Sequence, residues 1–125
     1  MIVSVDYGIH RTGIAISDNT EKIALKYKVI NENSLINLIN QIYEIVEQNN
    51  VSTVVLGVPK SNISKRIYII AKQLKRLGIQ VVLWDESFTS LIARENLQNL
   101  RVNKRNINCE SARIILQEYL DFKNG

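Results

Sequence analysis

The sequence predicts a mixed α/β fold in which an antiparallel half-sheet continues into a parallel half-sheet. Two observations lead to this prediction. Three short apolar segments with brief links open the chain, as in an antiparallel meander. Strand-like apolar runs then alternate with helix-like apolar stripes, and this alternation requires parallel crossover connections.

The composition is that of an ordinary globular protein. Of the 125 residues, 46% are hydrophobic and 22% are charged, so we expect a single domain over residues 1–125 rather than a disordered chain. No apolar run approaches the ~20 residues of a membrane span, and the start "MIVSVDYG" lacks a basic leader, so we expect a cytoplasmic protein with no membrane contact. The formal charge of +4 favours a polyanionic partner. The oligomeric state cannot be inferred from these properties.

The first half of the pattern consists of three strands. Residues 2–6 and 13–18 predict two strands around a short loop, and a third is expected over 23–30. The third strand carries its apolar residues at every second position: Ile23, Leu25, Tyr27 and Val29.

The second half alternates helices and strands. Ser34 is an expected N-cap for a helix that Asn49 and Asn50 end. The following strand, 52–58, is apolar on both faces, as a central parallel strand is, and Pro59 ends it. The remaining elements are expected at 62–77 (helix), 79–84 (strand), 89–98 (helix) and 108–121 (helix), with a polar, basic link before the last.

Acidic residues follow two strands of the expected parallel half. Asp6 ends the first strand, and Asp85 and Glu86 follow the fifth. Carboxyl ends of parallel strands meet at one edge of a sheet, where open α/β sheets bind their ligands. Hard oxygens from two strands suit a divalent cation, although each acid would also serve as a cap for a loop or helix.

Four ordered motifs carry a resemblance to a known family. The motifs are "DYGIHRTGIAISD", "VVLGVPK", "DESFTSLIA" and "NCESARIILQEYL". From Met1 to Leu120 the chain resembles the YqgF/RuvX family, small bacterial proteins of RNase H-like fold described as Holliday junction resolvases and as nucleases that process the 5′ end of pre-16S ribosomal RNA. The resemblance implies a five-stranded sheet in the order 3-2-1-4-5, with strand 2 antiparallel and helices on both faces.

The resemblance also implies a catalytic and metal-binding set: Asp6, Glu86 and Asn108. These residues would hold one or two Mg²⁺ or Mn²⁺ ions for phosphodiester hydrolysis. The family has aspartate where this chain has Asn108, and arginine where it has Ser87. Asn108 still offers a carbonyl oxygen, or simply caps the last helix. Glu110 is an alternative ligand only if that helix begins later, because positions 108 and 110 lie about 200° apart on a helix.

Several residues are candidates for binding nucleic acid: Arg11, Thr89, Ser90, Arg101, Lys104 and Arg105. Arg11 lies in the expected first turn, where it would bind a phosphate or remain a solvated cation. Thr89 and Ser90 match a hydroxyl pair of the family and would bond a phosphate or cap a helix. The three other cations lie in the basic link before the last helix.

Together these features predict a metal-dependent nuclease that acts on structured nucleic acid, with precursor ribosomal RNA preferred over branched DNA. The first alternative is a catalytically weakened nucleic-acid-binding module, which Asn108 and Ser87 would explain. A DNA junction resolvase is the second. Sugar-kinase and actin-like phosphotransferases also begin with a strand that ends in Asp-x-Gly and is followed by a hairpin. Their two lobes, however, need more than 125 residues.

Overall fold

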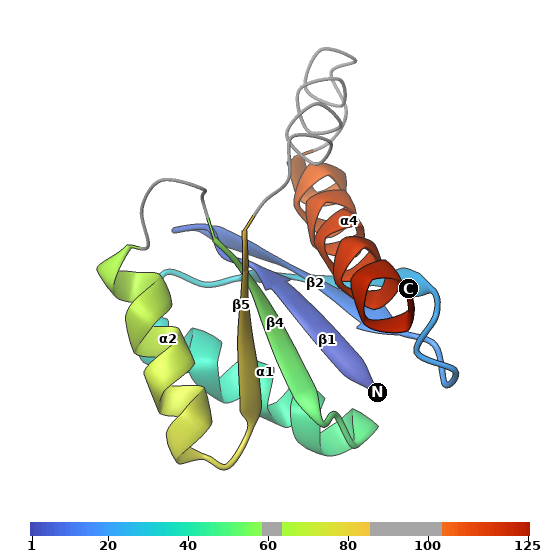
Figure 1. Ribbon diagram of the computed structural model, residues 1–125. Helices are drawn as coiled ribbons and strands as arrows, with labels where there is room; N and C mark the ends of the chain where they lie inside the picture. Colours follow the sequence, from blue (N-terminus) through green and yellow to red (C-terminus); the bar gives the residue numbers. More distant parts are fainter. Residues whose placement is uncertain (59–63, 86–103) are drawn as a thin grey trace.

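The computed structural model describes residues 1–58, 64–85 and 104–125, which form a five-stranded mixed sheet with helices on both faces (Figure 1). The elements are β1 (Ile2–Asp6), β2 (Arg11–Ser17), β3 (Ala24–Asn31), α1 (Leu35–Asn49), β4 (Thr53–Val58), α2 (Lys65–Arg76), β5 (Gln80–Asp85) and α4 (Lys104–Asn124). The strand order is β3-β2-β1-β4-β5. β2 is antiparallel to β1 and β3, whereas β4 is parallel to β1 and β5. The predicted order and strand directions are confirmed.

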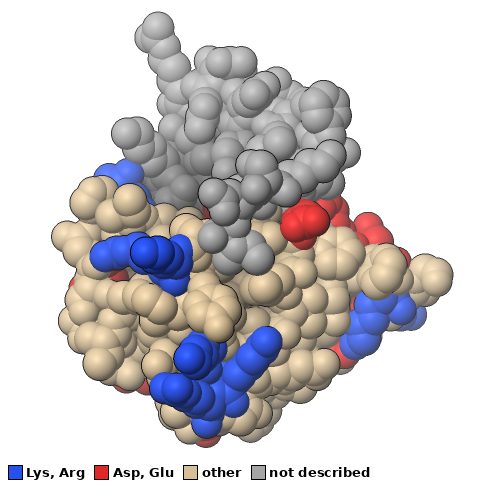
Figure 2. All heavy atoms as spheres, turned by 60° about the vertical axis from the view of Figure 1, so that its left-hand side comes forward, with Lys and Arg blue, Asp and Glu red and all other residues tan. Residues whose placement is uncertain are grey.

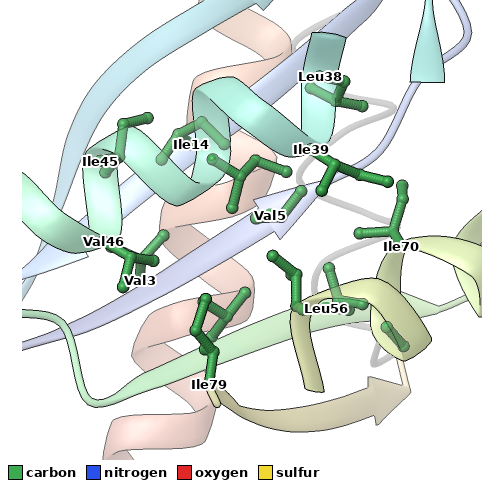
Figure 3. Packing of buried hydrophobic residues seen from close by; sticks show 14 of the residues in the cluster. Val3, Val5, Ile14, Leu38, Ile39, Ile45, Val46, Leu56, Ile70 and Ile79 are labelled. Carbon is green, nitrogen blue, oxygen red and sulfur yellow. The ribbon is translucent and has the colours of Figure 1, made fainter. Parts of the chain in front are cut away.

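The central strand β4 is buried on both faces, as its continuous apolar run predicts. Alternate side chains along the strand point to opposite faces. Val54, Leu56 and Val58 join the larger core cluster, together with residues of α1 and α2 (Figure 3). Val55 instead joins a second cluster with residues of α4. Helices α1 and α2 therefore cover one face of the sheet and α4 covers the other.

Serine side chains fix the starts of the two helices on the first face. Ser34 Oγ accepts a hydrogen bond from the Asn37 amide, which confirms the predicted N-cap. Ser64 Oγ accepts from the Ile67 amide at 3.2 Å, so α2 begins at Lys65 rather than at the predicted residue 62. None of the helices that the structure describes is apolar and long enough to cross a membrane.

Close contacts hold α4 against the opposite face. Ser4 Oγ on β1 donates a buried hydrogen bond to the carbonyl oxygen of Ala112 at 2.6 Å. A Cβ atom at Gly57 would lie 2.5 Å from Ile115 Cδ1, so the glycine leaves room for this side chain. Further along the helix, Gln117 accepts a hydrogen bond from the Ala24 amide at 2.9 Å. Helix α4 is thus bound to β1, β3 and β4.

Two further predictions about the elements were wrong. The last helix begins at Lys104 rather than at residue 108, because no proline or glycine interrupts residues 104–107. Asn108 therefore lies inside the helix and is not its N-cap. Consequently Lys104 and Arg105 belong to its first turn rather than to the link.

The second error concerns β3, whose apolar residues do not form one stripe. Val29 pairs with Gly13, whereas Leu25 pairs with Ile16, because Tyr27 is an extra residue in a β-bulge. The bulge reverses the alternation, so Leu25 and Val29 lie on opposite faces of the sheet. Leu25 is 49% exposed on this edge strand.

Truncation of a fully buried α4 side chain should measure how strongly this helix is docked. Leu116 is 0% exposed. We expect Leu116→Ala to lower the free energy of unfolding by about 2–5 kcal/mol, because it leaves a cavity under α4. Leu25→Ala is the matched control and should cost under about 1 kcal/mol, since an exposed side chain leaves no cavity. Urea titration gives both values, and equal losses in the two variants would contradict the described packing.

Candidate active site at the carboxyl edge of the sheet

Asp6 ends β1 at the edge of the sheet where the parallel strands also end. It is half-buried and lies opposite Gly13 of β2. β4 runs parallel to β1, and Asp85, the exposed last residue of β5, pairs with Val58 of β4. Because β4 alone separates β1 from β5, their backbones lie two strand spacings apart, about 10 Å. Asp6 and the end of β5 thus share the carboxyl edge, as predicted.

The loop after Asp6 is a tight turn that requires glycine. A Cβ atom at Gly8 would collide with the carbonyl oxygen of Arg11, so a larger residue would force the turn open. Thr12 Oγ1 closes the turn by donating to the Gly8 carbonyl at 3.3 Å. Arg11 itself is half-buried and begins β2, opposite Asn31, instead of lying in the turn. Gly8 therefore fixes the path by which the chain leaves the edge.

Sequence reasoning missed a cation beside this turn. Arg66 Nη1 donates a hydrogen bond to Tyr7 Oη at 2.7 Å, which links α2 to the residue that follows Asp6. Arg66 and Lys65 form the first turn of α2, where the helix dipole favours carboxylates instead. The sequence therefore does contain a signal for this site, namely two adjacent cations at the start of a helix.

Helix α4 runs antiparallel to β1, so its first turn points toward the same edge. Its C-terminal end lies at the opposite edge, where Lys123 Nζ and the amino group of Met1 bind the Glu21 carboxylate at 2.8 and 3.1 Å. Both cations lower the pKa of Glu21, Lys123 the more strongly. This network joins the C-terminal end of the helix to the amino edge of the sheet.

The contact between Ser4 and Ala112 sets the height of α4 along β1. From Ser4 to Asp6 the strand rises about 6.6 Å. From Ala112 back to Asn108 the helix rises about 6 Å. The backbone of Asn108 is therefore roughly level with Asp6.

Glu110, two residues further along α4, makes ion pairs on the β3 side of the helix. Its carboxylate binds Lys26 Nζ of β3 at 3.2 Å and also binds Arg113. Arg113, and to a smaller extent Lys26, lowers the pKa of the Glu110 carboxyl group. Its neighbour Cys109 is buried, and burial raises the pKa of the thiol, which disfavours a nucleophilic thiolate.

Part of the predicted site lies outside the described residues. Glu86, Thr89, Ser90 and Arg101 belong to this part, and the side chains of Lys104, Arg105 and Asn108 are not described either. Among the side chains that are described, no group of three or more His, Cys, Asp or Glu residues could hold a metal ion.

Comparison with protein families and sequences gives consistent matches over almost the whole chain. The model of the family described as "RuvX: Holliday junction resolvase" matches residues 1–122. A protein of Malacoplasma penetrans named "Putative pre-16S rRNA nuclease" is 33% identical, covering 98% of this chain and 94% of its own length. A protein of Chloroflexus aurantiacus with the same name is 34% identical, covering 100% of this chain and 89% of its own length.

Solved structures share the fold at low sequence identity. Thermus thermophilus RuvC in complex with a Holliday junction substrate aligns with a TM-score of 0.62 at 12% identity, covering 100% of this chain and 97% of that one. The fowlpox virus resolvase in complex with Holliday junction DNA also gives 0.62, at 18% identity and 99% coverage of both chains. The sheet order described above is thus that of RuvC-like resolvases, which confirms the predicted RNase H-like fold.

The ion pairs of Glu110 predict a pH-dependent contribution to stability. Because its pKa is lowered in the folded protein, the contribution is present at neutral pH, above the unfolded pKa, and is lost as pH falls through the folded pKa. We expect Glu110→Gln to be less stable than the original chain at pH 7. The difference should shrink below about pH 4.5, the ordinary range of a glutamate. Urea titrations over this range would contradict the ion pairs if the difference stayed constant.

Proposed function

This chain belongs to the RuvX family, and we propose that it is a metal-dependent nuclease that hydrolyses phosphodiester bonds in structured nucleic acid. One observation carries the proposal. The ends of β1 and β5 and the first turns of α2 and α4 all point to the carboxyl edge of the sheet. Acids end the two strands, cations begin α2, and cations lie on α4 at the same edge. An edge of this kind suits a phosphodiester between a metal-binding centre and a cationic rim.

The proposed ligands of the metal are Asp6, Glu86 and Asn108. All three offer the hard oxygen atoms that Mg²⁺ and Mn²⁺ prefer. Asp6 at the strand end and the roughly level backbone of Asn108 support this set, and Glu86 follows the last residue of β5. Bound Mg²⁺ or Mn²⁺ would activate a water molecule and neutralise charge on the leaving oxygen. Glu110 is a weaker candidate, because Lys26 and Arg113 already bind its carboxylate.

Cations at the edge would position the substrate backbone. Arg66 is held at the turn that follows Asp6 through its bond to Tyr7, and its guanidinium group would bind a phosphate that passes over this turn. Arg11 opens β2 next to the same turn. Lys104 and Arg105 lie on α4 at the same edge and are further proposed phosphate contacts. Arg101, Thr89 and Ser90 are further proposed contacts from the segment before α4.

We propose precursor 16S ribosomal RNA as the substrate, processed near its 5′ end. The name of the relatives at 33–34% identity supports this assignment. Cleavage of branched DNA is the second candidate, because the family description and the fold neighbours refer to Holliday junctions. A direct comparison of the two substrates with the same enzyme preparation separates these candidates.

A binding module that has lost its catalytic activity remains the alternative function. The specific observation that favours it is Asn108, which gives the proposed ligand set one negative charge fewer than aspartate would. A nuclease must take up Mg²⁺ or Mn²⁺ at this edge, whereas a module that only binds nucleic acid need not. Isothermal titration of the purified protein with Mn²⁺, with Asp6→Asn as the control, distinguishes the two.

Restoration of the acid at position 108 should strengthen metal binding. Asn108→Asp is nearly isosteric, so we expect the fold to be retained, while the added charge should increase Mg²⁺ affinity and the cleavage rate at sub-saturating Mg²⁺. The size of the increase separates a working nuclease (small) from a weakened one (large). Asp6→Asn in the same background should abolish cleavage.

Position 110 supplies the control for this experiment. Glu110→Gln should leave Mg²⁺ affinity nearly unchanged, because we assign its carboxylate to Lys26 and Arg113. If Glu110→Gln eliminated metal binding and Asn108→Asp had no effect, the assignment of the third ligand would be wrong.

Binding to RNA should depend strongly on salt and little on sequence. We expect Arg66→Gln, Lys104→Gln and Arg105→Gln together to reduce the slope of log affinity against log salt by up to about three phosphate contacts. The control removes the same charge elsewhere, with Lys28→Gln, Lys72→Gln and Lys75→Gln. Fluorescence anisotropy at several salt concentrations measures both slopes. Equal slopes in the two triple variants would move the RNA surface away from the carboxyl edge.

A further inference from the structure

An apolar groove lies between α1 and α2, on the outer surface of these helices. Its volume is about 450 Å³. The lining residues are Leu35, Ile36, Ile39, Asn40, Ile69, Gln73, Arg76 and Leu77. None of these residues belongs to the proposed nuclease site, so the groove needs a different explanation.

The side chains at the groove expose large apolar surfaces to solvent. Ile36 is 68% exposed, Leu77 is 47% exposed and Ile69 is 41% exposed. The inner faces of the same helices are already buried against the sheet, as Leu38 at 1% and Leu74 at 0% show. Ile36, Ile69 and Leu77 are therefore not needed to fill the core. Clusters of exposed apolar side chains mark interaction sites.

The α2 side of the groove is cationic, whereas α1 on the other side carries two acids, Glu44 and Glu47, and no cation. Helix α2 contains five cations and no acid: Lys65, Arg66, Lys72, Lys75 and Arg76. In Figure 2, which brings α2 forward, Lys and Arg side chains gather in separate groups with uncharged surface between them. Arg76 lines the groove itself, and the lining contains no acid. Among the residues that the structure describes, Lys72, Lys75 and Arg76 form no ion pair.

We propose that this groove is a docking site for an acidic amphipathic helix of a partner protein. Apolar residues on one stripe of that helix would contact Ile36, Ile69 and Leu77, as in other helix-in-groove complexes. Acidic residues beside the stripe would pair with Arg76 and Lys72. A groove that is apolar at its base and cationic along α2 recognises a helix that is apolar on one face and anionic beside that face.

The groove fits two other occupants less well. A second copy of this chain offers the cations of α2 only two acids on this surface, Glu44 and Glu47 of α1, and the whole chain carries a net charge of +4. An acidic helix is therefore the more complementary partner for the α2 side of the groove. Single-stranded RNA needs aromatic side chains for base stacking, whereas the lining is mainly aliphatic and holds no aromatic residue.

The test uses a helix-stabilised peptide with leucines on one stripe and glutamates on the flanks. We expect it to bind the full chain, and to shift the δ1 methyl resonances of Ile36 and Ile69 but not those of Ile23. Two matched peptides serve as probes of specificity. The first has lysine in place of each glutamate, and the second has the same composition with its leucines spread around the helix. Both should bind at least about tenfold more weakly.

Variants of the protein locate the contact. Ile69→Ser should weaken binding of the glutamate peptide by about tenfold or more, as expected for an anchor in a pocket. Ile23→Ser is its control, because Ile23 is also exposed, at 56%, but lies away from the groove. Arg76→Glu should weaken binding comparably, with Lys28→Glu as the matched charge control, and all four variants should cleave nucleic acid at the original rate.

Several results would overturn the proposal. These are no binding of the glutamate peptide, equal binding of the lysine peptide, no effect of Ile69→Ser, competition by RNA, or dimerisation of the chain through the groove. The nuclease assay is separate, so a failure of one proposal leaves the other standing.

Discussion

The docking of α4 against β1, β2 and β3 is the constraint on which the candidate site depends. The buried hydrogen bond from Ser4 Oγ to the Ala112 carbonyl at 2.6 Å fixes the height of the helix. Gly57 allows Ile115 to approach the sheet closely, and the Glu21 network holds the other end. A shift of one helical turn would move Asn108 by about 5.4 Å relative to Asp6 and separate the proposed ligands.

At the carboxyl edge, helix α2 begins with charges of the opposite sign to those that stabilise the start of an isolated helix. Lys65 and Arg66 begin α2, although carboxylates are the favoured residues at helix starts. Each placement costs a fraction of a kcal/mol in the free protein, on the order of 0.3–1 kcal/mol per charge. A polyanion bound at this edge would reverse that cost, so the same charges that weaken the start of α2 favour the substrate.

The sequence was sufficient to predict strand order and directions, because the β4 run and the alternating pattern leave few topologies, and the family resemblance selects one. It was not sufficient for β3, since the bulge at Tyr27 depends on the pairing with β2. The start of α4 was misplaced because Asn108 resembles a cap. Asp6 could be assigned to the edge from its strand alone. The hydrogen bond from Arg66 to Tyr7 could not be predicted from the sequence, because it joins residues that are 59 positions apart. Glu86, Thr89, Ser90 and Arg101 remain predictions.

The most direct test of the account is the paramagnetic broadening of amide resonances by Mn²⁺. If Asp6 and the first turns of α4 form one metal site, small additions of Mn²⁺ should broaden the amides of Asp6, Tyr7, Gly57 and Asn108 first. Asp6→Asn should remove this selectivity. Broadening that begins instead at Glu110 and Lys26, or at the amino edge near Met1 and Glu21, would contradict the proposed site.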